Sequence, residues 1–418
     1  MVGLALVGFG GYGFSLAQNI VKLSAGGSCR LVAAADMQLA SLPEQAKFLR
    51  DAGALLYTDM SEMFGRHKAD VQGVYIATGI ASHAPLTVAA LEQGFHVHLE
   101  KPPAATVQEV DRMQAAADRA GRMCMVGFQA VHGGFMRQIK QRIADGAVGR
   151  LRTIICHAGW PRNAEYYARN DWAGKLVRGQ SWVLDGPATN ALAHQVTNAL
   201  FLAGSSPADY AAPSAVRSEL YAAGPVESHN TAGIEIMTDT GIRIVLLLSH
   251  TTQEQWGPSF NIEGDAGRIE FDRDKPVTFV DAAGGRTTSV LPAPLPGSTV
   301  RAPGEQEEMI QLFVSAICAN APAMLACPLS QARKMVLAID AAHESAGRII
   351  RIDGPAVRRL DESTPKARTV VEGMDEAIRA AAAKGCLFGD LPARPAWAQP
   401  TEPFALNTYS SFPQRFKR

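Results

Sequence analysis

The chain has 418 residues, of which 40 are basic and 40 acidic, so its formal net charge at pH 7 is zero. This length exceeds the size at which a single hydrophobic core usually keeps growing, and it predicts two domains. Because the charges balance and no long run of either sign occurs, the sequence argues against nucleic acid or an anionic membrane as a partner and favours a small-molecule ligand. No apolar run approaches the roughly 20 residues that a membrane-spanning helix needs.

The six cysteines are scattered along the chain and indicate reduced thiols. They form no C-x-x-C pair, and no Cys/His cluster has the spacing of a zinc site, so we expect no bound metal. The first residues, MVGLALVGFG, are apolar but lack a basic flank and run into glycines, which is typical of a first strand rather than of an export signal. These features predict a cytoplasmic protein.

Short β-rich runs alternate with helical patterns up to about residue 130. Such alternation is typical of a parallel sheet covered by helices. It predicts an α/β domain at 1–130 with a doubly wound Rossmann sheet. The predicted strands are 3–9, 30–36, 71–78, 96–101 and 122–128, and the predicted helices between them are about 12–23, 41–52, 82–93 and 106–120.

After a predicted helix at 133–145, longer β-rich runs replace this alternation. Helices at about 187–203 and 305–320 are expected to cover one face of the resulting sheet. The pattern predicts an α+β domain at 131–353 with a large open, mainly antiparallel sheet. The predicted strands are 151–158, 215–223, 231–238, 242–250, 259–265 and 267–272.

The end of the chain divides into a helix–strand segment and a looser extension. The segment 329–353, with a helix and a short strand, is expected to pack back on the first domain. The extension 354–418 contains a predicted helix near 371–384 and then a proline-rich run. Because disordered tails are usually poor in aromatic residues, its aromatics predict a tail that packs onto a surface. These aromatics are Trp397, Phe404, Tyr409 and Phe412.

The motif GFGGYG directly follows the first predicted strand and opens a helix. Its glycines at positions 8, 10 and 13 permit a tight turn and let the backbone approach a pyrophosphate. The helix N-terminus then stabilises that anion through its N–H groups and its dipole. The expected cofactor contacts in this loop are Gly8, Phe9, Gly10, Gly11, Tyr12 and Gly13.

Asp36 ends the second predicted strand, where a carboxylate can accept hydrogen bonds from the ribose hydroxyls of NAD. The same charge disfavours the 2′-phosphate of NADP, and Met37 and Gln38 provide no cationic replacement. The sequence therefore favours NAD over NADP. The alternative is that the glycines only form a turn and that Asp36 caps a helix, but the order strand, motif, helix, strand and acid argues against it.

The stretch EKPPA begins with Glu100 at the end of the predicted strand 96–101. In a doubly wound sheet, ligands bind beyond the carboxyl ends of the strands, so Lys101 is expected to project toward the nicotinamide end of the cofactor. A lysine in that position can act as an acid or a base. The alternative is a solvated lysine in a surface turn.

Three segments together resemble the Gfo/Idh/MocA family of NAD(P)-dependent oxidoreductases: GFGGYG (8–13), ATGIASHAPLTVAALEQGFHVHLEKPPA (77–104) and IEGDAGRIEF (262–271). The resemblance covers roughly residues 3–353, and E-K-P is its most specific element. It implies a Rossmann domain, an α+β domain whose open sheet mediates homodimer or homotetramer contacts, and activity on sugars, cyclitols or related polyols. By this resemblance Lys101 is the catalytic lysine, framed by its two neighbours.

The stretch TNALAHQ places a His four residues after an Asn. Read as a helix from Pro187, it has one polar face without Lys or Glu, which suits an enclosed polar cavity. A hydrogen-bonded core histidine is the alternative. The predicted polar face comprises Asn190, His194, Thr197 and Asn198.

By the resemblance, His194 takes the position of a family His that stands over the substrate, and Asn190 takes that of an Asp four residues earlier. His194 is therefore a candidate to exchange a proton with a substrate hydroxyl or to orient it. An amide can hold a hydroxyl but cannot take a proton, so Asn190 departs from the family pattern, and Asn190→Asp is expected to restore it. Asp185, in the sequence LDGP, is interpreted as a turn or helix cap.

The remaining candidates lie in two segments. By the resemblance, GFQAVHGG (127–134) enters the active site, which makes His132 and its neighbour Gln129 weaker candidates. The loop after the strand 151–158 carries aromatic residues that are suited to bind a sugar ring or to stack for structural reasons alone. The loop residues are Trp160, Arg162, Tyr166 and Tyr167.

The expected contacts with the two ligands can now be given together. The expected substrate contacts are Lys101, Gln129, Trp160, Arg162, Asn190 and His194. Besides the glycine loop and Asp36, the expected cofactor contacts are Thr78, His83, Glu100, Lys101 and Gln129.

The sequence predicts an NAD-dependent oxidoreductase that moves a hydride between a secondary alcohol of a sugar, cyclitol or related polyol and the nicotinamide. Lys101 is the expected acid or base, assisted by His194. Two alternatives stay open. A glycosidase would use NAD to oxidise a sugar transiently, eliminate the leaving group and return the hydride. A non-catalytic NAD-binding scaffold would need neither residue.

Overall fold

The computed structural model describes residues 1–272, 276–289 and 304–418. All six cysteines are free thiols. Across these described ranges, no helix is both long enough and apolar enough to cross a membrane. The chain forms two compact units, each of which is taken by itself. The first comprises Met1–Ala104, Gln108–Gly133 and, of Arg301–Arg333, the described part; the second comprises Ala105–Val107, the described parts of Gly134–Val300, and Lys334–Arg418.

The first unit is built on a six-stranded parallel sheet with the order β3-β2-β1-β4-β5-β6. This is the order of a Rossmann domain, so the predicted doubly wound fold is confirmed. The strand order reverses between β1 and β4, and sheets of this kind bind ligands beyond the carboxyl ends of the strands at such a point. The strands are β1 (Val2–Val7), β2 (Cys29–Ala35), β3 (Leu55–Tyr57), β4 (Gly73–Ile76), β5 (His96–Leu99) and β6 (Cys124–Val126).

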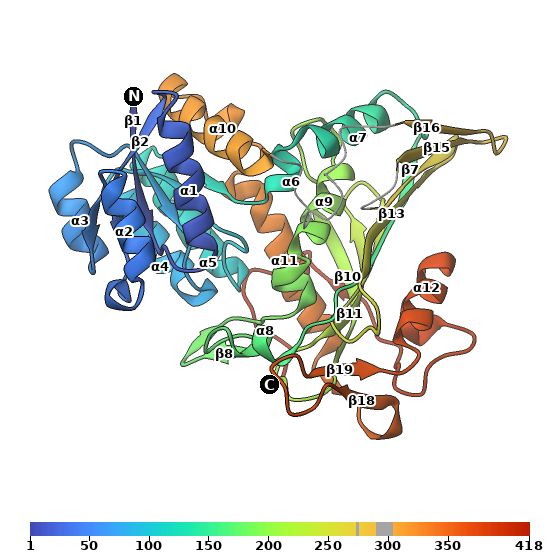
Figure 1. Cartoon of the computed structure of the whole chain (residues 1–418). Coiled ribbons are helices and arrows are strands. Elements are labelled where there is room, and N and C mark those ends of the chain that lie inside the picture. Colours follow the sequence, from blue (N-terminus) through green and yellow to red (C-terminus); the bar gives the residue numbers. More distant parts are fainter. Residues whose placement is uncertain (273–275, 290–303) are drawn as a thin grey trace. The chain divides into compact units, whose positions relative to one another are not determined.

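The helix α10 (Glu305–Ala319) completes the first unit, where Figure 1 shows it beside α1. The ring of Phe313 packs edge-on against Tyr75 of β4, and Gln306 accepts a hydrogen bond from Asn19 of α1 at 2.5 Å. The prediction that 305–320 covers the second sheet is therefore wrong. The helices of this unit are α1 (Tyr12–Ser24), α2 (Pro43–Asp51), α3 (Met60–His67), α4 (Ile80–Glu92), α5 (Val107–Ala120), α6 (Gln129–His132) and α10.

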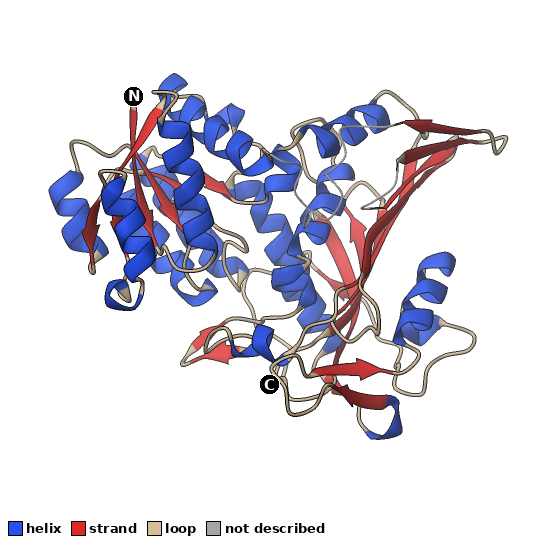
Figure 2. Ribbon diagram, in the orientation of Figure 1, coloured by secondary structure: helices blue, strands red, loops and turns tan. Residues whose placement is uncertain are grey.

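The second unit contains a ten-stranded sheet with the order β16-β15-β14-β13-β7-β12-β11-β10-β17, and β20 also pairs with β10. Most neighbours run antiparallel, whereas β7 with β12 and β10 with β17 pair in parallel, which confirms the predicted large, mainly antiparallel sheet (Figure 2). Its strands are β7 (Leu151–Gly159), β10 (Pro213–Ala222), β11 (Thr231–Thr238), β12 (Arg243–Ser249), β13 (Trp256–Gly264), β14 (Gly267–Asp272), β15 (Val277–Asp281), β16 (Arg286–Ser289), β17 (Ile350–Arg351) and β20 (Phe404–Ala405); two short hairpins are β8 (Val177–Arg178) with β9 (Ser181–Trp182), and β18 (Val357–Leu360) with β19 (Arg368–Val371).

Figure 1 shows α9 and α12 on opposite faces of this sheet. The helix α12 lies in the extension, and its Met374 and Ile378 share a buried apolar cluster with Val245 and Leu247 of β12. Of the segment 329–353, only 329–333 belongs to the first unit. The helices of the second unit are α7 (Gly134–Ala144), α8 (Ala164–Ala168), α9 (Ala193–Leu202), α11 (Leu329–Ala346) and α12 (Met374–Lys384); of these, α11 begins in the first unit.

The aromatic tail packs against the second unit, as predicted. Phe404, Tyr409 and Phe412 are buried, and Trp397 is half-buried. The buried carboxylate of Glu344 on α11 anchors this tail, because it accepts three successive backbone N–H groups and a tyrosine hydroxyl at 2.6 to 3.0 Å. The three N–H groups belong to Gln414, Arg415 and Phe416, and the hydroxyl to Tyr409.

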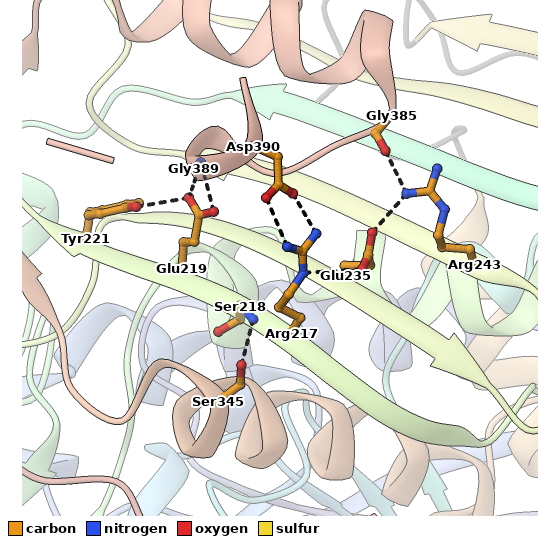
Figure 3. Close-up of polar contacts among 10 residues, drawn as sticks. All are labelled: Arg217, Ser218, Glu219, Tyr221, Glu235, Arg243, Ser345, Gly385, Gly389 and Asp390. Carbon is orange, nitrogen blue, oxygen red and sulfur yellow. Dashed lines mark hydrogen bonds and ion pairs between the residues drawn. The ribbon is translucent and has the colours of Figure 1, made fainter. Parts of the chain in front are cut away.

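Polar contacts fasten the extension to β10 (Figure 3). Arg217 donates to both carboxylate oxygens of Asp390, at 3.0 and 2.6 Å. Two residues further along the strand, Glu219 accepts the N–H of Gly389 and the hydroxyl of Tyr221, both at 2.9 Å. A fully buried carboxylate thus lies in the contact between the sheet and the extension.

Glu219 is expected to make the stability of this contact depend on pH. Burial raises the pKa of its carboxyl to about 7, although the hydrogen bonds from Gly389 and Tyr221 oppose the shift. A carboxyl whose pKa is raised by folding stabilises the fold below its ordinary pKa and loses that contribution as the pH rises through the folded value. Urea denaturation should therefore show the free energy of unfolding falling by about 2–3 kcal/mol from about pH 5 to about pH 8. Glu219→Gln should flatten this slope and Glu402→Gln, at an exposed position, should not; equal slopes in both would contradict the assignment.

Candidate functional site

The glycine loop joins β1 to α1 at the carboxyl edge of the parallel sheet. Gly8 has a φ of +83°, and a Cβ there would lie 2.6 Å from the carbonyl oxygen of Ala77. A Cβ on Gly13 would lie 2.2 Å from the carbonyl oxygen of Gly8, so glycine lets α1 pack directly on the loop. Among the described residues, the nearest atom to a Cβ on Gly10 is in Leu42, at 3.7 Å. The packing of the described residues thus admits a Cβ at Gly10, unlike at Gly8 and Gly13, and a glycine at this position suits the close approach of a pyrophosphate.

Alanine at Gly10 and at Gly13 should have different effects. Gly13→Ala is expected to lower the free energy of unfolding by about 2 kcal/mol, because its Cβ overlaps a backbone oxygen. Gly10→Ala should fold as stably as the unmodified chain but bind NADH about tenfold more weakly, because the methyl group occupies the approach to the loop. Thermal unfolding and fluorescence titration with NADH measure the two effects. Unchanged NADH affinity in Gly10→Ala would mean that no phosphate lies on that side of the loop.

Asp36 follows β2, the neighbour of β1, and its carboxylate lies at the glycine loop. Its Oδ2 accepts the N–H of Phe9 at 3.0 Å, and its Oδ1 accepts the N–H of Gln38 at 2.9 Å. These two hydrogen bonds fix a half-exposed carboxylate beside the loop. Each carboxylate oxygen can accept more than one hydrogen bond, so Asp36 retains capacity for ribose hydroxyls.

His83 of α4 lies between the segments that follow β4 and β5. Its Nε2 lies 3.0 Å from the carbonyl oxygen of Thr78, which follows β4. Its Nδ1 lies 2.8 Å from the carbonyl oxygen of Pro102, in the turn after β5. The ring is 1% exposed, and this burial lowers the pKa of His83. The neutral ring carries one N–H, so His83 lies between the two backbone carbonyls and donates to one of them.

Lys101 follows β5 and Glu100 at the same edge of the sheet. The Lys101 side chain is half-buried, whereas Glu100 is buried and accepts the N–H of Lys101 at 3.3 Å. A Cβ on Gly127, just beyond β6, would lie 2.8 Å from Oε1 of Glu100. Glu100 is thus packed against the loop of the next strand, while Lys101 stands at the carboxyl edge.

The short helix α6 carries Gln129 and His132, the weaker candidates. Both are buried in the first unit, and the Nε2 of His132 lies 3.4 Å from the carbonyl oxygen of Val126. Because α6 begins shortly after β6, Gln129 lies at the same edge of the sheet as Lys101. The first unit thus places all its predicted cofactor residues beyond the carboxyl ends of its strands.

In the second unit, Asn190 and His194 do not share one continuous α-helix. Residues Pro187–Ala191 form a π-helical turn, in which the N–H of Leu192 donates to the carbonyl of Pro187 at 2.8 Å. Leu192 has non-helical dihedral angles, and α9 begins at the next residue. The predicted α-helix from Pro187 is therefore wrong at its start. A π turn is wider than an α turn, so it re-aims the side chains that follow, and such turns are frequent at functional sites.

The polar residues of α9 are buried, as both the predicted polar cavity and the alternative of a core histidine require. All ten residues of this helix are buried, including His194, Thr197 and Asn198. Hydrogen bonds are electrostatically stronger in such surroundings than in water. His194 therefore stands where a hydrogen bond to a ligand would be strengthened.

Asn190 is paired with the carboxylate of Asp185. Its Nδ2 donates to Oδ1 of Asp185 at 2.8 Å. The Asp185 side chain is buried and also accepts the N–H of Gly174 at 2.7 Å, and Arg169 lies 3.9 Å from it. Gly186 occupies the cap position of the π turn, so the interpretation of Asp185 as a cap is wrong. The carboxylate of Asp185 is thus directly hydrogen-bonded to the Asn190 amide.

The loop after β7 holds Trp160 and Arg162 in different ways. Trp160 is 8% exposed, and its Nε1 donates to the carbonyl of Gly257 at 3.2 Å. The guanidinium of Arg162 lies over the ring of Tyr166, 4.6 Å from its centroid, and that of Arg169 lies 3.7 Å from the same centroid. Trp160 is therefore a packed residue with a satisfied N–H. It also belongs, with Arg162, to a cluster of cations and aromatic rings, because the Arg162 guanidinium lies 5.5 Å from its ring centroid.

Two family models match the chain. Residues 2–128 match a model described as the oxidoreductase family with an NAD-binding Rossmann fold. Residues 136–270 match the GFO/IDH/MocA C-terminal domain. The two matches together cover more than half of the chain, and the extension 354–418 lies outside both.

Two curated proteins match parts of the chain. The 2,7-anhydro-N-acetylneuraminate hydratase of Mediterraneibacter gnavus is 31% identical over 174 residues, which are 41% of this chain and 40% of that protein. The 1-carboxy-3-chloro-3,4-dihydroxycyclohexa-1,5-diene dehydrogenase of Comamonas testosteroni is 36% identical over 126 residues, 30% of each chain. The chain therefore spans less than half the length of these relatives.

A solved structure of levoglucosan dehydrogenase with NADH aligns with 82% of this chain and 96% of its own. The TM-score is 0.66 and the sequence identity is 21%. At this identity, the alignment shows a shared fold.

Proposed function

Because the chain belongs to the Gfo/Idh/MocA family of oxidoreductases, we propose that it is an NAD-dependent enzyme that transfers a hydride between a secondary alcohol of a sugar, cyclitol or related polyol and the nicotinamide. One observation carries the proposal: the glycine loop, Asp36 and Lys101 all follow strands of one parallel sheet at its carboxyl edge. Doubly wound sheets bind dinucleotides at this edge.

The residues at this edge fit NAD better than NADP. Gly10 suits the close approach of a pyrophosphate, and the N-terminus of α1 stabilises its charge. The Asp36 carboxylate accepts hydrogen bonds from ribose hydroxyls and repels a 2′-phosphate, and the neighbouring Met37 is exposed and uncharged. When bound, NAD supplies the hydride acceptor.

Lys101 is the acid or base of the proposed reaction. Its ε-amino group accepts the proton of the reacting hydroxyl when the substrate is oxidised and returns it in the reduction. His194 binds and orients the same hydroxyl, and Asn190, fixed by Asp185, holds a neighbouring one. The other proposed substrate contacts are Gln129, Trp160 and Arg162.

A second candidate function involves no net redox change. The relative from M. gnavus is named a hydratase, and a hydratase adds water without net oxidation. The corresponding candidate for this chain is an NAD-dependent glycosidase, in which transient oxidation of the sugar permits elimination of the leaving group before the hydride returns.

NADH absorbance during turnover separates these functions. The full-length chain is incubated with NAD and a panel of sugars, cyclitols and glycosides, and both NADH and released product are quantified. Stoichiometric NADH accumulation supports the dehydrogenase. Product release without NADH supports the glycosidase, and tight NAD binding without any turnover would favour a non-catalytic scaffold and contradict both enzymes.

A further inference from the structure

A pocket of about 280 Å³ in the second unit is lined by arginines from two distant parts of the chain. Arg162 comes from the loop after β7, whereas Arg359 and Arg368 come from the hairpin β18–β19 of the extension. No Asp or Glu lines this pocket among the described residues. The volume is near the lower end for small-ligand pockets and suits a molecule of monosaccharide size.

The three arginines have no carboxylate partners in the described part of the chain. Arg162 lies over the ring of Tyr166, and its Nε is buried without a hydrogen-bond partner there. Arg368 donates to the carbonyl of Gln253 at 2.7 Å, and Arg359 is exposed. Positive charges that no carboxylate neutralises, gathered around one pocket, attract an anion.

Other titratable groups at the pocket leave this positive charge intact. His250 also lines the pocket, and burial together with the charge of Arg162 lowers the pKa of its ring to about 3, so it is neutral at pH 7. On the neighbouring elements, Glu165 is exposed to solvent and Asp185 is engaged with Asn190. The net charge of the lining at neutral pH therefore comes from the arginines.

A short chain of contacts joins the pocket to the pair of Asp185 and Asn190. Arg162 and Arg169 both lie over the ring of Tyr166. Arg169 also lies 3.9 Å from Asp185, whose carboxylate holds the Asn190 amide. One aromatic ring and one ion pair thus connect the pocket with the residues proposed to hold substrate hydroxyls.

We propose, as an extension that rests on the proposed function, that this pocket binds a carboxylate or phosphate group of the substrate, so that the enzyme acts on sugar acids or sugar phosphates. Arg162, Arg359 and Arg368 donate charge-assisted hydrogen bonds to that group, which neutral polyols lack. Two of the three arginines belong to the extension, outside both matched family domains. The extension therefore contributes to substrate specificity.

Calorimetric titration of the full-length chain with NADH present tests this proposal. The probes are D-glucuronate, D-galacturonate, glucose 6-phosphate and neutral D-glucose. One class of anion should bind, and D-glucose should bind at least about tenfold more weakly. Rising salt concentration should lower the affinity for the anion. The uronate and phosphate arms identify which group the pocket holds.

Arginine variants locate the binding. Arg359→Gln and Arg368→Gln should each weaken anion binding roughly 10- to 100-fold, the range expected for a lost charge-assisted hydrogen bond. Arg358→Gln is the matched control, because this exposed neighbour does not line the pocket and its removal should leave the affinity unchanged. An equal loss of anion affinity in all three variants would indicate a general charge effect and overturn the assignment of the pocket as the anion site.

Turnover assays on the same samples distinguish failure of the pocket from failure of the proposed function. Oxidation of neutral sugars alone, with no binding of any anion, would overturn the pocket and leave the proposed function standing. Anion binding that depends on Arg359 and Arg368, but without hydride transfer from any sugar acid or phosphate, would overturn the assignment of the pocket to a substrate. NADH formation from a bound anion, lost in both variants, supports both proposals.

Discussion

Lys101→Ala is expected to reduce turnover of the proposed reaction by about 10²-fold or more and to leave NADH binding nearly unchanged. The ε-amino group is the proposed acid or base, whereas the glycine loop after β1 and Asp36 after β2 are proposed to hold the cofactor. Steady-state kinetics and NADH titration measure the two effects separately. Lys68→Ala, at an exposed position of the first unit, is the control and should change neither.

Lys101→Arg separates proton transfer from simple charge. Arginine keeps the positive charge but does not release its proton in the accessible pH range. The variant should therefore be as slow as Lys101→Ala if the lysine exchanges a proton, and it should retain most activity if only charge matters. Undiminished turnover in Lys101→Ala would remove this residue from the mechanism.

The helix α10 shows how far the sequence predicts the fold. Its pattern of apolar residues predicts a helix over 305–320, because side-chain spacing reports which face is buried. The spacing does not report which sheet covers that face, and Phe313 packs on the first unit instead of the second. The strand β3 was missed for another reason: with three residues it is too short to show a recognisable alternation.

The candidate site was predictable where a local motif fixes the backbone. The glycine loop is such a case, because the close approaches at Gly8 and Gly13 follow from their places in GFGGYG. The hydrogen bond between Asp185 and Asn190 was not predictable from α-helical spacing, since Asn190 lies within a π turn and the only signal was an acid in LDGP. The pocket at Arg162 was equally hidden, because its other arginines come from a hairpin almost two hundred residues later.

Asn190→Asp is expected to destabilise the protein rather than simply restore the Asp–His pairing of the family. Asn190 donates to the buried Asp185 at 2.8 Å, so the exchange sets two carboxylates against each other. Like charges this close raise one pKa of the pair, and the pair then retains a proton. A carboxyl whose pKa is raised by folding stabilises at low pH and loses that contribution as the pH rises, so the variant should lose unfolding free energy as the pH rises above about 4, the ordinary pKa of Asp, by up to about 1.4 kcal/mol per pH unit. Denaturation at several pH values measures this loss.

The double exchange Asp185→Asn with Asn190→Asp tests whether the two side chains act as a pair. It keeps one carboxylate and one amide but reverses their order, so it should recover most of the stability that Asn190→Asp loses, with a positive coupling in the double-mutant cycle. It also moves the carboxylate to the position that the family Asp occupies, where it can stabilise an imidazolium by charge. The pH dependence of turnover in the double variant should therefore differ from that of the unmodified chain. If Asn190→Asp is as stable as the unmodified chain at high pH, the two residues are not in contact. If the pH profile of turnover is unchanged in the double variant, the amide at position 190 is incidental to the mechanism.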